Sequence, residues 1–256
     1  MRSRSILGLI AAGAALPLLA LALAGAAAAD PTGASGTTGA SGASGASGAT
    51  GTTGTTAPVI PDVRLHPGER GADVVLLQQE LRKLHYVVGR HGVYDAATAR
   101  AVEAFRKMTG MKRDQDADHA VFAALAAGRG VFQALYPHQP AHVEGDLTHQ
   151  VLALVGSHGR VERLYPMSSG RPGLQTQTGI FRVYMQELGV NNDDMVDSSF
   201  FNGGDAIHGY HFVPPYAWSH GCLRVPIPDA LSIHNWVRIG MIVDVYYRPA
   251  PHRQRH

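Results

Sequence analysis

The chain has 256 residues, of which 45% are hydrophobic and 16% charged, and it carries 22 lysines and arginines against 20 aspartates and glutamates. A charge balance this close to neutral gives no basis for nucleic acid or an anionic membrane surface as a partner. An intramolecular disulfide is also excluded, because the chain has a single cysteine, Cys222.

Residues 1–29 have the pattern of a secretory signal peptide. Arg2 and Arg4 precede an apolar run over residues 6–24, and the small residues 27–29 offer a cleavage site. The run of roughly 20 residues is also long enough to remain as a membrane anchor. We expect cleavage and an exported protein, so that a membrane is a partner only if the leader is retained.

Residues 30–62 are expected to form a disordered linker. They consist mainly of Gly, Ala, Ser and Thr, with the triplet Ala-Ser-Gly repeated between residues 40 and 48. This composition cannot bury a core, and the near absence of proline argues against a collagen-like helix. A flexible tether between the export signal and the folded part is therefore predicted.

The next segment has the periodicity of three short helices. Apolar residues at helical spacing indicate a first helix over residues 74–84, with Asp73 placed to cap its start. Asp95 is the expected N-cap of a second helix, which Gly110 closes. A third helix is predicted over residues 119–127, and the three together would form a small core.

Specific residues in this segment resemble a peptidoglycan-binding domain of the three-helix PG_binding_1 type. The resemblance is carried by Gly71, Val74, Leu77, Gln78, Leu81, Leu84, Tyr86, Gly92, Tyr94, Asp95, Thr98, Ala101, Val102 and Phe105. It covers residues 63–128 and implies a unit that binds glycan, with a helical spacer that binds nothing as the alternative. Such domains usually carry an Asp-Gly turn before the last helix, where this chain has Asp114, Gln115 and Asp116.

Residues 131–248 change to a β-rich pattern with one helix. Short β-rich runs are found at residues 151–155, 161–165, 180–185 and 241–247, and turn signals at Gly145-Asp146, 156–159 and 168–173. A helix is predicted from Pro228 or Asp229 to Arg238. These elements predict a mainly β, sandwich-like or barrel-like domain, and hence an α+β multidomain chain. The basic tail, residues 249–256, is expected to fray.

Two short strings contain the parts of a thiol active site, namely Ala206-Ile207-His208-Gly209 and Ser219-His220-Gly221-Cys222-Leu223-Arg224-Val225. A free cysteine has a pKa of about 8.5 and is mostly protonated at neutral pH, so catalysis needs a neighbouring imidazole. His208 and His220 are the candidates. Gly221 would let backbone amides of its turn approach a developing oxyanion.

The ten residues between His208 and Ser219 are expected to form a stiff, aromatic loop beside the thiol. Phe212, Tyr216 and Trp218 lie in it, together with two prolines. Any one of these aromatic residues is best explained by ordinary packing. As a group next to Cys222, however, they are candidates for a wall of the substrate site.

The two strings resemble the L,D-transpeptidase catalytic domain, also called the YkuD domain, whose signature is a His-Gly pair followed by Ser-His-Gly-Cys. The string from Tyr165 to Gly170 also resembles the family's strand and turn before its Thr-Pro-x-Gly segment. Two departures occur. That segment reads Thr-Gln-Thr-Gly at residues 176–179, without the proline, and the spacing from His208 to the cysteine motif is short.

The resemblance implies roles for individual residues. Cys222 would be the nucleophile and His208 the proton donor and acceptor, with His220 and Gly221 supporting the site and its oxyanion hole. The substrate contacts implied in addition are Gly209, Tyr216, Trp218, Ser219 and Arg224. Two roles for Arg224 stay open: binding a substrate carboxylate, or bracing the motif loop.

The activity implied is formation of 3-3 cross-links in the cell wall, without a metal or other cofactor. Cys222 would attack the third residue of a peptidoglycan stem peptide, expel the terminal D-alanine and pass the acyl group to an amine of a neighbouring stem. Carbapenem antibiotics are the expected class of inhibitor, and the glycan and stem peptides are the expected partners.

Three alternatives to this activity are considered. Water or a protein amine as acceptor would make the enzyme an L,D-carboxypeptidase or a wall-attachment enzyme. His208, His211, His220 and Cys222 are also, by residue type, capable of binding zinc. Finally, the chain would be a non-catalytic wall-binding protein if the helical segment were its only functional part.

Overall fold

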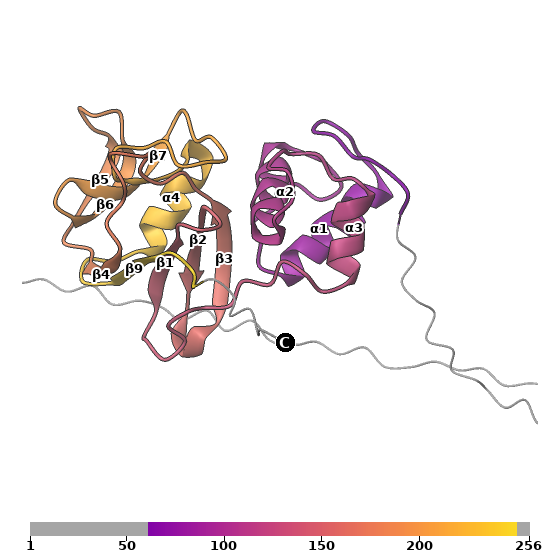
Figure 1. The fold of residues 1–256 in the computed structure, drawn as a ribbon. Coiled ribbons are helices and arrows are strands. Elements are labelled where there is room, and N and C mark those ends of the chain that lie inside the picture. The colour runs from indigo at the N-terminus through magenta and orange to yellow at the C-terminus, as the bar shows by residue number, and fades with distance from the viewer. Residues whose placement is uncertain (1–60, 250–256) are drawn as a thin grey trace, which may run out of the picture. The chain divides into compact units, whose positions relative to one another are not determined.

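The computed structural model describes residues 61–249 (Figure 1), so the predicted signal peptide, almost all of the predicted linker and the end of the tail lie outside the described residues. Those three assignments stay predictions. The described residues fall within a single compact unit. Across residues 61–249, none of the helices has both the length and the apolar character needed to cross a membrane.

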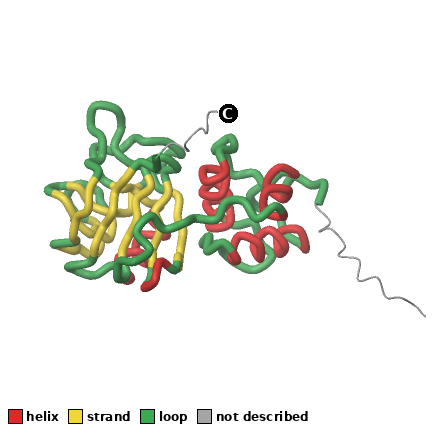
Figure 2. The backbone as a smooth tube through the Cα atoms, turned by 60° about the horizontal axis from the view of Figure 1, so that its bottom comes forward, coloured by secondary structure: helices red, strands yellow, loops and turns green. Residues whose placement is uncertain are grey.

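Three helices form the first part of the described chain, and strands dominate the second (Figure 2). The helices of the first part are α1 (Ala72–Lys83), α2 (Ala96–Thr109) and α3 (His119–Ala126). Each helix overlaps a stretch of sequence for which we predicted a helix.

The caps of α2 follow the sequence prediction, whereas the start of α1 does not. Asp95 accepts a hydrogen bond from the backbone N–H of Thr98 at 3.0 Å, and Gly110 ends α2 in the left-handed conformation with φ 70°. For α1 the predicted cap is wrong. The helix begins after Gly71, which offers no side chain for capping, and Asp73 lies inside the first turn, where its charge favours the helix dipole.

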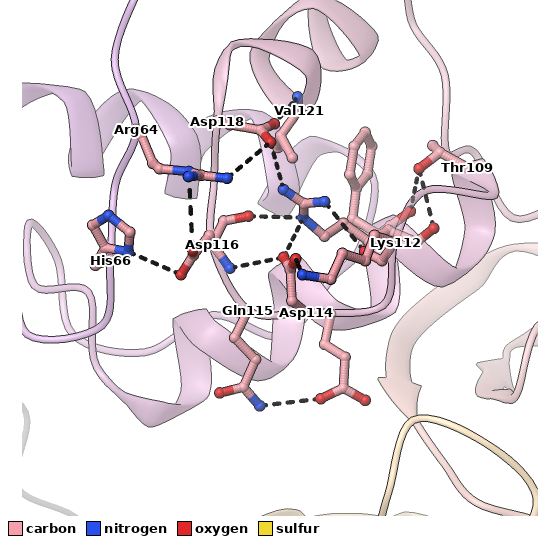
Figure 3. A network of polar contacts seen from close by, with 12 residues as sticks. Arg64, His66, Thr109, Lys112, Asp114, Gln115, Asp116, Asp118 and Val121 are labelled. Atoms are coloured by element: carbon pink, nitrogen blue, oxygen red, sulfur yellow. Dashed lines mark hydrogen bonds and ion pairs between the residues drawn. The ribbon is translucent and has the colours of Figure 1, made fainter.

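Asp114 and Asp116 lie in a network of polar contacts with Asp118 and Arg64 (Figure 3), and a buried arginine compensates for the departure at Asp114–Asp116. Arg106 is only 3% exposed, and its guanidinium donates to the carbonyl oxygens of Asp116 at 2.8 Å and Lys112 at 3.2 Å. It also lies 3.1 Å from the carboxylate of Asp114 and 2.9 Å from that of Asp118. Because one cation satisfies both carbonyls and both carboxylates, the turn holds its shape without the usual Asp-Gly pair.

Two mixed sheets follow. The first sheet has the strand order β3-β2-β1-β9-β4 and the second β5-β6-β7-β8. Their bounds are β1 (His142–Asp146), β2 (Val151–Val155), β3 (Val161–Pro166), β4 (Gly179–Arg182), β5 (Met185–Val190), β6 (Val196–Asn202), β7 (Asp205–Tyr210), β8 (Leu223–Pro226) and β9 (Ile242–Tyr246). This arrangement confirms the predicted α+β class.

Two local predictions in this part are wrong. Gly145 and Asp146, expected in a turn, are buried in β1, which pairs with both β2 and β9. The Asp146 carboxylate tolerates this burial because it accepts hydrogen bonds from the backbone N–H groups of Thr148 and His149. The turn begins at Leu147, directly after β1. The single strand expected over residues 180–185 is divided into β4 and β5, which belong to different sheets.

Strand β2 separates two hydrophobic cores. Val151, Ala153 and Val155 pack into a core shared with the three helices. Leu152 and Leu154 point to the other face, into a core completed by the second sheet and by helix α4 (Ile227–Trp236). All five side chains are fully buried, because successive residues of a strand face opposite sides and both sides are covered. The helices therefore pack directly on the first sheet.

Polar contacts also join the helices to the β-rich part. The Arg100 guanidinium in α2 donates to both carboxylate oxygens of Asp229 in α4, at 2.8 and 2.9 Å. The Lys107 ammonium in α2 is fully enclosed and donates to the carbonyl oxygens of Gln150 at 3.3 Å and Met167 at 3.1 Å. Neighbouring strand ends are thus held by side chains from a helix far earlier in the sequence.

Candidate active site

The expected nucleophile and base line one pocket of about 380 Å³. Its lining comprises Asp193, Asp194, Met195, Gly204, His208, Tyr210, His220, Cys222 and Arg224. The parallel pairing of β7 with β8 explains why they meet, because His208 lies opposite Arg224. Cys222 directly precedes β8 and lines the same pocket as His208 and Arg224. The pairing register of β7 with β8 could not be predicted from the sequence.

His208 is held as a neutral imidazole. It is 2% exposed, and its Nδ1 lies 2.9 Å from the Gly209 carbonyl oxygen. A carbonyl only accepts, so Nδ1 carries the proton and Nε2 keeps a free lone pair. Burial is the main cause that lowers the pKa of His208 to about 4; the hydrogen bond to Gly209 opposes this shift and the positive charge of Arg224 adds to it.

Cys222 is a half-buried thiol rather than a preformed thiolate. Its Sγ donates to the carbonyl oxygen of Gly204 at 3.7 Å, and one side packs against Met195, Phe200 and Ala206. Burial raises the pKa of the Cys222 thiol, with the Asp205 carboxylate adding to the rise. The site therefore holds a thiol and a neutral imidazole.

The turn before Cys222 can be formed only with glycine at position 221. Gly221 has φ 139°, and a Cβ built on it would lie 2.1 Å from Oδ1 of Asp205. The Ser219 hydroxyl closes the turn by donating to the Cys222 carbonyl oxygen at 2.6 Å and accepting from the Gly221 N–H at 3.1 Å. Ser219 is fully buried, so its part is to shape the turn.

A second segment, residues 168–176, supports this turn, and sequence analysis assigned it no such part. The Thr176 hydroxyl donates to the Gly221 carbonyl oxygen at 2.6 Å and accepts from the Gly170 N–H at 2.9 Å. The Ser169 carbonyl oxygen accepts from the Ser219 N–H at 2.8 Å. Thr176 begins the Thr-Gln-Thr-Gly string, so the string was a signal for a supporting residue.

Four expected substrate contacts lie outside the lining of this pocket, and Ser219, in the turn described above, is one of them. Gly209 is buried against α4, where an added Cβ would lie 2.7 Å from the Cβ of Ala230, so glycine is required there by packing. The half-exposed rings of Tyr216 and Trp218 stack edge-on at 5.9 Å, centroid to centroid. The Ser168 hydroxyl fixes their loop by donating to the Tyr216 carbonyl oxygen at 2.6 Å.

Arg224 braces the site with its backbone and leaves its side chain free. Its N–H and carbonyl oxygen exchange hydrogen bonds with Ser168 at 3.0 and 2.9 Å. The guanidinium carbon lies 3.9 Å above the Tyr210 ring. Its Nε is buried and has no hydrogen-bond acceptor within residues 61–249.

The zinc alternative finds no ready-made ligand set in the described part of the chain, where no three or more His, Cys, Asp or Glu residues are grouped to hold a metal ion. His211, one of the four residues considered, lines a neighbouring pocket of about 460 Å³ instead of the pocket that contains Cys222.

Comparisons with known proteins agree with both resemblances. The YkuD family model, the L,D-transpeptidase catalytic domain, matches residues 140–245, and the PG_binding_1 model, a peptidoglycan binding domain, matches residues 70–125. The solved structure of the L,D-transpeptidase (residues 123-326) from Xylanimonas cellulosilytica DSM 15894 is 34% identical, with a TM-score of 0.64. The match covers 74% of this chain and 100% of that one. This chain belongs to the L,D-transpeptidase family.

More distant L,D-transpeptidase structures are also similar. The protein from Stackebrandtia nassauensis is 22% identical over 72% of this chain and 96% of its own, with a TM-score of 0.45. L,D-transpeptidase 3 from Mycobacterium tuberculosis, in complex with a faropenem-derived adduct, is 18% identical over 41% of this chain and 59% of its own, with a TM-score of 0.37. No curated protein matches the chain.

Proposed function

We propose that this chain is an exported L,D-transpeptidase that forms 3-3 peptidoglycan cross-links through an acyl-enzyme on Cys222. One observation carries the proposal. The single cysteine of a family member lies in one pocket with a histidine whose Nε2 is free to accept a proton. The fold of residues 64–128 and the peptidoglycan-binding family model support attachment to the wall through the helices.

In the first half-reaction the thiol and the imidazole act together. As Sγ of Cys222 bonds to the carbonyl carbon of the third stem residue, the thiol proton passes to Nε2 of His208. The C–N bond to the terminal D-alanine then breaks, and the same proton leaves with the D-alanine amine. Since both groups start uncharged, this buried pocket never has to hold a resting ion pair.

In the second half-reaction an amine of a neighbouring stem bonds to the thioester carbon. Nε2 of His208 takes a proton from that amine, the C–S bond breaks, and the proton returns to the sulfur of Cys222. Stabilisation of the oxyanion would use the Cys222 N–H, because the Gly221 N–H is already bonded to Ser219.

Mass spectrometry on the purified protein tests this proposal. Incubation with a disaccharide tetrapeptide should give a thioester adduct on Cys222 and then a cross-linked dimer, whereas release of tripeptide alone would indicate a carboxypeptidase. A carbapenem should label the protein once. The Cys222→Ala variant should keep binding to sacculi and lose both adducts, and equal carbapenem labelling of the two proteins would show that the thiol has been misassigned.

Export is tested separately by N-terminal sequencing of the protein recovered from its host. A mature N-terminus near Asp30 would show that the leader is cleaved at the site that the sequence predicts. An intact leader in the membrane fraction would show an anchor instead, and protein confined to the cytosol would refute export.

A further inference from the structure

Arg224 has a cationic side chain with unused hydrogen-bonding capacity at the reacting centre. The guanidinium is fixed in position by Tyr210, which also packs edge-on against the His208 ring with a centroid distance of 5.7 Å. Within residues 61–249, the buried Nε of Arg224 has no hydrogen-bond acceptor. Arg224 as a whole is half-buried and lines the pocket, so a ligand in the pocket could supply acceptors for the rest of its guanidinium.

The chemistry of the two proposed half-reactions limits which ligand Arg224 could bind. In the first half-reaction the group that leaves the acyl carbon is D-alanine, an amine whose carbon bears a carboxylate. In the second half-reaction the attacking amine forms the new C–N bond at the same carbon, from the position that the leaving amine vacated. A cation placed to hold the carboxylate of the leaving amino acid is therefore equally placed for an attacking amino acid.

We propose that Arg224 forms a single carboxylate subsite used in both half-reactions, and that the preferred acceptor is an amine whose carbon carries a carboxylate. This inference rests on the proposed acyl-enzyme. Among the three acceptors considered, it favours the amino-acid end of a diaminopimelate-type stem. Water and a lysine side chain of a protein both lack the carboxylate, so neither gains from the subsite.

The opposite charges of the pocket are consistent with this preference. Asp193 and Asp194 lie in the turn between β5 and β6 and line the same pocket, with exposed side chains. A free amino acid arrives as a zwitterion, whose ammonium group is attracted by the two aspartates and whose carboxylate is attracted by Arg224. A neutral or purely cationic amine has at most one of these attractions.

The test separates transfer from acylation. A stem tripeptide prepared as a C-terminal thioester with a neutral thiol leaving group can load Cys222 without using a leaving-group carboxylate. The rate of aminolysis is then compared for D-alanine and D-alaninamide, which differ only in the carboxylate. We expect the ratio of the two kcat/KM values to fall roughly 10- to 100-fold in Arg224→Gln, because one charge-assisted contact is lost.

The kcat/KM ratio for D-alanine over D-alaninamide is compared between the native protein and each variant, so the different basicity of the two amines cancels. Mass spectrometry of the thioester adduct on Cys222 and an unchanged thermal midpoint should show that Arg224→Gln folds and is acylated, and the amine ratio is compared only between acylated proteins. Asp193→Asn, which removes a charge of the opposite sign from the same pocket, should leave the ratio equal or higher.

The outcomes distinguish the two proposals. If the native protein is not acylated on Cys222 by the thioester, the proposed function fails. If it is acylated but Arg224→Gln keeps the native ratio, or Asp193→Asn lowers the ratio as much as Arg224→Gln, the carboxylate subsite is refuted while the acyl-enzyme stands.

Discussion

Replacement of Lys107 by methionine should destabilise the fold by about 3 kcal/mol. The Lys107 Nζ lies 2.9 Å from the carboxylate of Glu103, which is itself only 7% exposed, and donates to the carbonyl oxygens of Gln150 and Met167. Removing one partner of a buried ion pair costs about 3–5 kcal/mol, because the remaining charge stays desolvated. The lower end applies here, since Gln115 still donates to Glu103 at 3.1 Å. Methionine fills the space of the lysine stem, so a cavity contributes little.

Urea and thermal denaturation measure this effect. A loss of about 3 kcal/mol corresponds to a fall in Tm of roughly 6–12 °C for a folded unit of this size. The double variant Lys107→Met/Glu103→Leu should recover most of the loss, because replacing a whole buried pair by apolar residues is often neutral. The reasoning is refuted if the single variant loses less than about 1 kcal/mol, or if the double variant is no more stable than the single one.

Two further predictions concern His208 and Gly209 in strand β7. Activity towards the thioester donor should persist as the pH falls and be lost only near pH 4. The reason is that the pKa of His208 is lowered to about 4 and the neutral imidazole is the form that accepts a proton. An acid limb of kcat/KM near the ordinary histidine pKa would contradict this. Gly209→Ala should cost about 1–3 kcal/mol by overpacking against α4, in urea denaturation, because its Cβ would lie 2.7 Å from that of Ala230. The matched variant Gly204→Ala, whose Cβ meets nothing within 4 Å, should change stability by less than about 0.5 kcal/mol, and an equal loss in both would show that packing is not the cause.

Local sequence determined the features that depend on neighbouring residues. Asp95 and Gly110 delimit α2 because a capping carboxylate and a left-handed glycine act within one helical turn. The run 151–155 is a strand with the predicted bounds, since its apolar residues are suited to burial on both faces. The chemical signature around Cys222 was likewise readable, because the required residue types stand close together in the chain.

Only the tertiary structure decided how those features come together. Parallel pairing of β7 with β8 brings His208 and Cys222 to one pocket, and no local pattern fixes a pairing register. Asp146 could enter a buried strand only because later residues, including Arg248, supply partners for its carboxylate. The burial of Lys107 depends on strand ends far along the chain, so its local sequence, which reads as an ordinary helix, gave no sign of it.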